Sequence, residues 1–348
     1  MKKCRVILLM LVTLSLLLMV MFSACSAEDP SATTAKSNLD VTVTTKNQTV
    51  ITTTLRNPAT TVTVTEVAVT TATVTSGTTE RLPSEWVSAV FGGGPFVTGG
   101  TPVANIMKAS GFNTMIIWSV HVLPDGTLKL NDIEVCKDGK YIGSGRYKTA
   151  WQSLKEGKTS IERVEISVGA WECQDFDNIK ALIERDGTGK DTVLYKNFAA
   201  LIEATGADAV NYDDETCYDL ASAVKFTEMC ADMGVKVTLC PYNNMNFWVS
   251  LNNSVGEYID RIYLQCYAGG AGNDPEQWSL AFGEKVIPGY WCLHNNGEGT
   301  SVPMLKRTLR LSGDEITGAF IWFYDDLQKL SSPNSAKDYA AAINEAKK

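Results

Sequence analysis

Residues Asp208 to Glu215 read DAVNYDDE, an apolar strand pattern that runs directly into three acidic side chains. Successive side chains of a strand alternate between its two faces, so Asn211, Asp213 and Glu215 share one face. In a parallel barrel that face points inward, and the carboxyl ends of the strands meet at the mouth where the chemistry takes place. The stretch therefore predicts a buried parallel strand with a reactive group at its carboxyl end.

Seven other short apolar runs, rich in Val, Ile and aromatic residues, repeat this pattern with amphipathic, helix-like stretches between them. The eight predicted strands are Trp86–Phe91, Asn113–Trp118, Arg163–Val168, Ala207–Tyr212, Lys236–Cys240, Arg261–Cys266, Lys285–Tyr290 and Thr317–Phe323. Continuous apolar runs separated by helices are typical of parallel strands covered on their outer face.

Eight such strands, in a segment close to the ~250 residues of a typical barrel, predict an α/β fold with a single (β/α)8 TIM barrel over residues 83–348. A doubly wound open sheet gives the same local pattern and stays as the alternative. Within Val120–Arg146 the turn signals PDG and KDG predict a β-hairpin inserted after the second strand.

The paired carboxylates indicate the kind of chemistry. Asp213 and Glu215 lie roughly 6–7 Å apart along one face of a strand. Their mutual repulsion raises one pKa and leaves a protonated acid near neutral pH, which is what protonation of a glycosidic oxygen requires. The chain has only two histidines, His121 and His294, so a histidine-rich zinc site is excluded, and neither histidine is given a role.

At these residues a family resemblance emerges. DAVNYDDE resembles the D-G-x-D-x-D-x-E signature of glycoside hydrolase family 18, the chitinases and endo-β-N-acetylglucosaminidases. Asp208, Asp213 and Glu215 match the signature, whereas Ala209 replaces its glycine and Asn211 replaces its middle aspartate. Three further stretches resemble family motifs in the right order: ISVGAW at Ile166–Trp171, LQCY at Leu264–Tyr267 and AFIW at Ala319–Trp322.

The resemblance implies a glycosidase that cleaves β-1,4 linkages next to N-acetylglucosamine by a substrate-assisted retaining mechanism. Glu215 would be the general acid, while Asp213 and Tyr267 would orient and polarise the substrate acetamide. Trp322 would form the floor of the sugar subsite. No metal or organic cofactor is implied. Asp214 would point to the opposite face of the strand, and the DDE ending favours, mildly, members that cleave the core of N-glycans.

Other residues at the predicted strand ends are candidates for substrate contacts. Those predicted to bind substrate besides Trp322 are Gln265, Asn211, Tyr242, Asn243 and Trp291. For Trp118 and Trp171 packing is slightly favoured over sugar contact. The amide at position 211 cannot exchange a proton with Asp213, although it can still donate a hydrogen bond to it. An alternative function is therefore a weak or inactive surface carbohydrate-binding module, a chitinase-like lectin.

The N-terminal segment is typical of an export signal. Lys2, Lys3 and Arg5 precede an apolar run that ends in FSAC, which resembles a bacterial lipobox. We expect residues 1–24 to be a lipoprotein signal peptide and Cys25 to be acylated. The lipid would anchor the protein to the extracellular face of the bacterial cell membrane. A plain transmembrane anchor and a cleaved signal are the alternatives.

Residues 25–82 are predicted to be a flexible, disordered stalk. Nineteen of the fifty residues from 31 to 80 are threonine, and none is aromatic, so no core can form there.

The remaining seven cysteines are scattered and odd in number, which argues against a complete disulfide framework but leaves one disulfide open. Among them Cys240, Cys266 and Cys292 are expected to be small apolar core residues.

Charge limits the possible partners. The chain carries 31 Lys and Arg against 39 Asp and Glu, a net charge of −8, which offers little to a phosphate backbone. Nucleic acid is therefore excluded as a partner. The expected partners are a GlcNAc-containing glycan and, through the lipid on Cys25, a membrane. The protein is expected to be a monomer.

Overall fold

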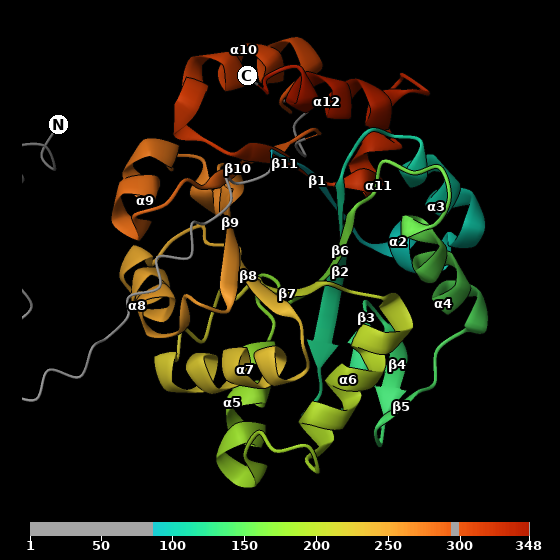
Figure 1. Ribbon diagram of the computed structural model, residues 1–348, viewed down its shortest axis with the longest axis vertical. Coiled ribbons are helices and arrows are strands. Elements are labelled where there is room, and N and C mark those ends of the chain that lie inside the picture. The colour runs from blue at the N-terminus through green and yellow to red at the C-terminus, as the bar shows by residue number, and fades with distance from the viewer. Residues whose placement is uncertain (1–85, 294–298, 348) are drawn as a thin grey trace, which may run out of the picture. The chain divides into compact units, whose positions relative to one another are not determined.

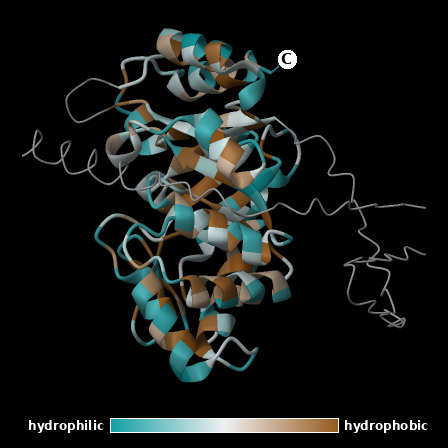
Figure 2. Ribbon diagram, turned by 90° about the vertical axis from the view of Figure 1, so that its left-hand side faces the viewer, coloured by the Kyte–Doolittle hydropathy of each residue, from teal (hydrophilic) through white to brown (hydrophobic). Residues whose placement is uncertain are grey.

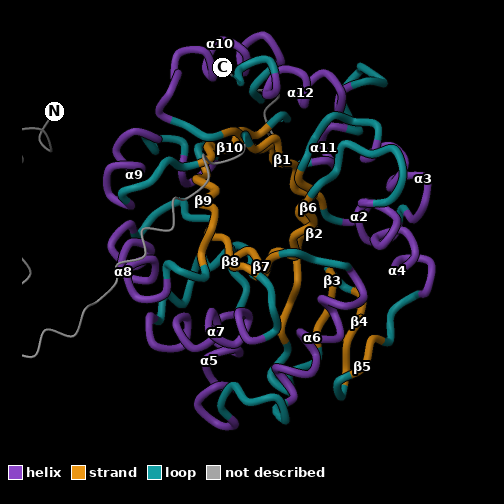
Figure 3. The backbone as a smooth tube through the Cα atoms, viewed as in Figure 1, coloured by secondary structure: helices purple, strands orange, loops and turns teal. Residues whose placement is uncertain are grey.

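The computed structural model describes residues 86–293 and 299–347. Eight parallel strands form a closed ring in which the first strand pairs with both the second and the last (Figures 1 and 3). The strands of the ring are β1 (Val87–Gly92), β2 (Thr114–Val122), β6 (Arg163–Val168), β7 (Ala209–Tyr212), β8 (Lys236–Leu239), β9 (Ile259–Gln265), β10 (Ile287–Trp291) and β11 (Gly318–Trp322). The closed ring confirms the (β/α)8 barrel and removes the open-sheet alternative.

Helices surround the ring (Figure 3). They are α2 (Gly94–Thr98), α3 (Gly100–Lys108), α4 (Gly145–Gln152), α5 (Asp175–Asp186), α6 (Val193–Thr205), α7 (Leu220–Asp232), α8 (Met245–Val255), α9 (Pro275–Phe282), α10 (Val302–Ser312), α11 (Tyr324–Leu327) and α12 (Ser335–Asn344). Side chains set several helix starts: Asp219 accepts a hydrogen bond from the Ser222 amide, and Thr192 accepts one from the Tyr195 amide. Within the described residues, no helix has the length and apolar character needed to cross a membrane.

The hydrophobic core has two parts. The larger part fills the space between the strands and the helices, whose ribbons carry both apolar and polar residues (Figure 2). The smaller part fills the inside of the barrel and consists of Val87, Ala89, Phe91, Ile116, Cys240, Tyr263, Tyr267, Ile287 and Phe320. The barrel interior is therefore packed with side chains.

A buried charge cluster lies toward the amino ends of the strands. Glu165 is fully buried, and its carboxylate accepts hydrogen bonds from Arg163 Nε at 2.7 Å and from the Tyr263 hydroxyl at 2.9 Å. Arg163 also binds both carboxylate oxygens of Asp260, at 2.8 and 2.9 Å. Because a buried charge is costly unless it is paired, these contacts are what allow Glu165 to face the barrel interior.

The predicted insertion after the second strand is present and has more strands than a simple hairpin. β2 continues to Val122 and pairs with β3 (Leu128–Leu130), which leads into β4 (Ile133–Lys137) and β5 (Lys140–Tyr141), all antiparallel. Asn197 on α6 holds both turns of the insertion, because its side chain accepts from the Gly139 amide at 2.7 Å and donates to the Gly126 carbonyl at 2.6 Å.

All seven cysteines in the described part of the chain are free thiols. Cys240 and Cys292 are buried in the core as expected, and Cys266 is half-buried against it. The predictions for the signal peptide, Cys25 and the stalk lie outside the described residues, as does His294.

Candidate active site

Asp213 directly follows β7, at the carboxyl end of that strand, and is 3% exposed. Its Oδ2 accepts a hydrogen bond from Trp118 Nε1 at 3.1 Å, and its Oδ1 accepts one from Gln265 Nε2 at 2.9 Å. Trp118 lies on β2 and Gln265 ends β9, so donors from two other strands fix both carboxylate oxygens. Such fixed geometry is what a group that positions substrate requires.

Glu215 is half-buried and lies next to Asp213, as strand alternation predicted. The amide nitrogen of Gln265 lies 3.4 Å from Glu215 Oε1 and 3.2 Å from the Cys240 carbonyl oxygen. A single side-chain amide therefore faces both carboxylates. The structure brings together the predicted pair and one of the predicted binding residues.

Burial dominates the electrostatics of this pair. It raises the pKa of Asp213 well above its usual range, and the negative charge of Glu215 raises that pKa further. Burial also raises the pKa of Glu215, although hydrogen bonds from Gln265 and Asp213 act in the opposite direction. Two neighbouring carboxyl groups with raised pKa values titrate as a pair and retain a proton toward neutral pH.

Asp214 points away from the mouth, as expected. Its carboxylate accepts hydrogen bonds from the backbone amides of Thr216, Cys217 and Tyr218 at 2.8–3.1 Å. These bonds hold the loop that carries Glu215. Gly169, directly after the neighbouring strand β6, has φ +97°, and a Cβ atom there would collide with the Asp213 carbonyl oxygen. Only glycine allows the two strand ends to approach this closely.

Aromatic side chains form the floor beside the carboxylates. The rings of Trp322 and Tyr267 stack with their centroids 5.8 Å apart, and Trp118 meets Trp322 edge-on at 4.8 Å. Trp291 meets Tyr267 edge-on at 6.1 Å, and its Nε1 donates to Asp326 Oδ2 at 2.7 Å. The predicted residues Tyr267, Trp322 and Trp291 thus pack together, with Tyr267 buried and the two tryptophans half-buried. Trp118 packs against it as expected and, in addition, binds Asp213.

The remaining candidates lie in the loops after β6 and β8. Tyr242 is half-buried, and its ring meets Trp171 edge-on at 6.4 Å. Trp171 is 62% exposed, so the expectation that it packs in the core is wrong: it lies just after β6, in the loop before α5, with little covering it. Asn243 is exposed and accepts a hydrogen bond at 2.6 Å from the hydroxyl of Tyr218, a residue that sequence reasoning missed.

Asn211 lies deeper in the barrel than the two carboxylates and is fully buried. Its Oδ1 accepts from Ser167 Oγ at 2.8 Å and its Nδ2 donates to Thr238 Oγ1 at 2.9 Å, so the amide is engaged by neighbouring strands rather than by Asp213. Thr238 in turn donates to Glu165 Oε2 at 2.6 Å. In this position Asn211 supports the strand beneath Asp213, and it does not form part of the wall of the mouth.

Asp208, the first residue of the matched signature, lies at the other end of the strand. Its carboxylate binds Lys155 Nζ at 2.7 and 2.8 Å and accepts from the Val164 amide at 2.9 Å. These contacts connect β7 to the neighbouring chain segments far from the mouth. Asp208 is therefore a structural residue.

The sequence matches no protein-family model and no curated protein. Solved structures do resemble this one. The family 18 chitinase ChiB from Flavobacterium johnsoniae has a TM-score of 0.54 at 11% identity, covering 76% of this chain and 96% of its own. The chain shares the fold of solved family 18 chitinases.

Two further neighbours have the same barrel. A family 18 chitinase from Cycas revoluta in complex with (GlcNAc)4 has a TM-score of 0.50 at 11% identity, covering 74% of this chain and 99% of its own. The spore cortex-lytic enzyme SleL from Bacillus cereus has a TM-score of 0.51 at 11% identity, covering 74% of each chain. At these identities the likeness concerns the fold.

Proposed function

We propose that this protein is a glycoside hydrolase of the family 18 type that cleaves β-1,4 linkages next to N-acetylglucosamine. The observation that carries the proposal is the arrangement at the barrel mouth: buried Asp213 and half-buried Glu215 face one amide of Gln265. The aromatic floor of Trp322 and Tyr267 lies beside them. Flat aromatic faces are suited to sugar rings, and a carboxyl pair that retains a proton is suited to acid catalysis.

In the proposed mechanism Glu215 donates its proton to the glycosidic oxygen as the C1–O bond breaks. The acetamide oxygen of the substrate attacks C1 and forms a cyclic oxazolinium ion, while Asp213 and Tyr267 hold the acetamide in place. Water then attacks C1 and returns a proton to Glu215, so the ring opens with net retention. Each step uses only side chains of this chain, the substrate and water.

The raised pKa values support these roles. A general acid must keep its proton at working pH, and burial raises the pKa of Glu215 in that direction. Burial raises the pKa of Asp213 as well, so the two carboxyl groups hold a proton between them, and the mechanism uses that proton on Glu215. The Gln265 amide, which faces both groups, sets how the charge is shared.

A second candidate is a carbohydrate-binding module without activity. Asn211 favours it, because an amide stands where the family signature has an acid and its hydrogen bonds go to Ser167 and Thr238. Release of reducing ends from GlcNAc oligomers distinguishes the two functions: a hydrolase releases them and a binding module does not.

The substrate is best identified by product analysis on three GlcNAc-containing glycans side by side: chitooligosaccharides, a high-mannose glycoprotein and peptidoglycan. The neighbours motivate this choice, since one was solved with (GlcNAc)4 and another is a cortex-lytic enzyme. Cleavage of a β-1,4 bond next to GlcNAc in any of the three supports the proposal. Binding without cleavage of all three supports the lectin alternative.

We also propose that the barrel is held at the outer face of a bacterial membrane. Support comes from the sequence alone: a basic and apolar segment ends at the lipobox-like FSAC, and a threonine-rich segment follows. Two acyl chains on Cys25 would supply a stable anchor, because a single chain binds membranes only marginally.

A further inference from the structure

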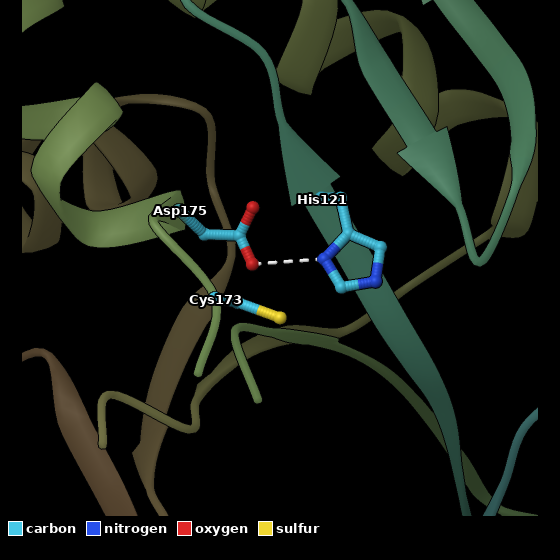
Figure 4. Close-up of side chains that lie close together, drawn as sticks. All are labelled: His121, Cys173 and Asp175. Atoms are coloured by element: carbon cyan, nitrogen blue, oxygen red, sulfur yellow. Dashed lines mark hydrogen bonds and ion pairs between the residues drawn. The ribbon is translucent and has the colours of Figure 1, made fainter. Parts of the chain in front are cut away.

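Three side chains of different ligating chemistry meet beside the mouth of the barrel (Figure 4). His121 lies near the carboxyl end of β2, Cys173 in the loop after β6, and Asp175 is the first residue of α5. One ligand atom from each, namely a ring nitrogen, the sulfur and a carboxylate oxygen, lies within 4.8 Å of the other two. Asp175 is buried, and His121 and Cys173 are half-buried.

The side chains of His121 and Asp175 are each oriented by a second hydrogen-bond partner. His121 Nε2 is 2.8 Å from Ser119 Oγ, and Asp175 Oδ1 accepts from the Val122 amide at 2.8 Å. These contacts leave His121 Nδ1 and Asp175 Oδ2 facing each other at 2.9 Å, and the Cys173 sulfur points to the space beside them (Figure 4). Metal-binding histidines and carboxylates are usually held by outer contacts of this kind.

A hydrolytic triad and a purely structural ion pair both fit this geometry less well than a metal site does. The hydrogen-bond order Ser119, His121, Asp175 is that of a triad, but Ser119 is 1% exposed and cannot reach a substrate as a nucleophile. A structural His–Asp pair accounts for the 2.9 Å contact alone and gives no reason for a thiol directed at the same space.

We propose that His121 Nδ1, Cys173 Sγ and Asp175 Oδ2 bind one divalent cation of the Zn²⁺ class, with water as the fourth ligand. A mixed set of nitrogen, sulfur and oxygen suits this borderline-soft ion, and three protein ligands with one open position are common for it. Tetrahedral coordination places ligand atoms about 3–4 Å apart, which small side-chain rotations supply. On binding, the Cys173 thiol loses its proton to solvent, and the His121 ring carries its proton on Nε2, where Ser119 Oγ accepts it, so that Nδ1 binds the ion.

The thiol itself is not ionised without a metal. Burial raises the pKa of Cys173 to about 11, and the neighbouring Asp175 raises it further. A bound divalent cation removes this barrier, because a thiol that coordinates a metal ion is deprotonated by it.

The test uses the full-length protein, kept reduced, and titrates it with Co²⁺, whose bond to a thiolate gives a near-ultraviolet charge-transfer absorption. We expect this band to saturate at one Co²⁺ per chain and to disappear when Zn²⁺ is added. Cys173→Ser should abolish the band, and His121→Gln, which removes a ligand, should weaken Co²⁺ affinity by more than the ~10-fold that loss of an outer contact costs. Cys217→Ser, which removes another half-buried thiol near the mouth, is the matched control and should keep the band.

Calorimetric titration with Zn²⁺ and thermal unfolding complete the test without relying on hydrolysis. Zn²⁺ should raise the unfolding midpoint of the parent and of Cys217→Ser but not that of Cys173→Ser, and circular dichroism checks that all variants are folded. A parent that shows no Co²⁺–thiolate band overturns the site. An unchanged band in folded Cys173→Ser also overturns it. Either result leaves the proposed hydrolase function untouched, because none of these measurements involves a glycan.

Discussion

The side-chain amide of Gln265 donates a hydrogen bond to Asp213 at 2.9 Å while the same nitrogen lies 3.4 Å from Glu215. One group at the end of β9 thus contacts both carboxylates at the end of β7. It stabilises the charged form of Glu215 and so lowers a pKa that burial raises. Gln265 is therefore expected to set the pH range of the reaction as well as to bind substrate.

Replacement of this amide tests that expectation. Gln265→Leu removes a donor to the charged form of Glu215, so the pKa of Glu215 should rise and the acid should keep its proton to higher pH. The descending, alkaline limb of kcat/KM against pH should move to higher pH. Gln152→Leu, at an exposed helix position, is the control. An unmoved limb in Gln265→Leu contradicts the role of the amide.

We expect the hydrogen bonds around position 211 to require an amide side chain. The one hydroxyl proton of Thr238 is donated to Glu165, so Thr238 can only accept from position 211. In Asn211→Asp an ionised carboxylate would face the lone pair of the Thr238 hydroxyl oxygen in a buried site. The pKa of the introduced carboxyl group in the folded state would therefore lie above the unfolded value of ~3.9. The variant should therefore lose stability as pH rises above ~4, by about 1–3 kcal/mol at neutral pH.

Urea unfolding of Asn211→Asp at pH 4.5 and pH 8 checks the direction in which stability changes with pH. The destabilisation relative to the parent should be small at the lower pH and larger at the higher pH. Asn243→Asp, at an exposed position on the wall of the mouth, should show little difference at either pH. Equal destabilisation of Asn211→Asp at both values would speak against the network.

Trp118 is expected to act through its ring N–H. Trp118→Phe keeps an aromatic edge against Trp322 but removes the donor that lies 3.1 Å from Asp213. We expect kcat to fall about tenfold, worth about 1.4 kcal/mol, with little change in KM. Trp86→Phe removes an N–H bond to the Ile343 carbonyl near the C-terminus and should leave kcat unchanged. A loss confined to KM in Trp118→Phe would assign the residue to binding instead.

Cys25 provides the test of the membrane anchor. Only a thiol can accept the diacylglycerol, so Cys25→Ala should leave the protein unlabelled by a fatty-acid probe and free of the membrane fraction. Cys4→Ala, within the same N-terminal segment, should label like the parent. If Cys25→Ala labels as strongly as the parent, the lipobox interpretation is wrong.

Much of the fold could be predicted from apolar runs. The predicted strand Arg163–Val168 has the same bounds as β6, and the other seven lie within two residues at most ends. β2 is the exception, since it continues to Val122. There the strand leaves the ring and pairs with β3, a contact that depends on the inserted segment and not on local sequence.

The site could be predicted only in part. Strand alternation placed Asp213 and Glu215 on one side and Asp214 on the other, because that depends on neighbours in the sequence. The bond from Trp118 to Asp213 joins residues 95 positions apart, and periodicity contains no such information. The contact between His121 and Asp175 also joins residues that are far apart in the sequence. The sequence pattern therefore assigned His121 no role.

The most direct test of the account is the turnover of Glu215→Gln on GlcNAc oligomers. The amide keeps the shape and a hydrogen-bond donor but cannot protonate a leaving oxygen, so the rate should fall by at least ~10²–10⁴. Binding of the oligomer should survive, since the aromatic floor and Asp213 are unchanged. A Glu215→Gln variant that turns over at the parental rate would contradict the assignment of Glu215 as the acid.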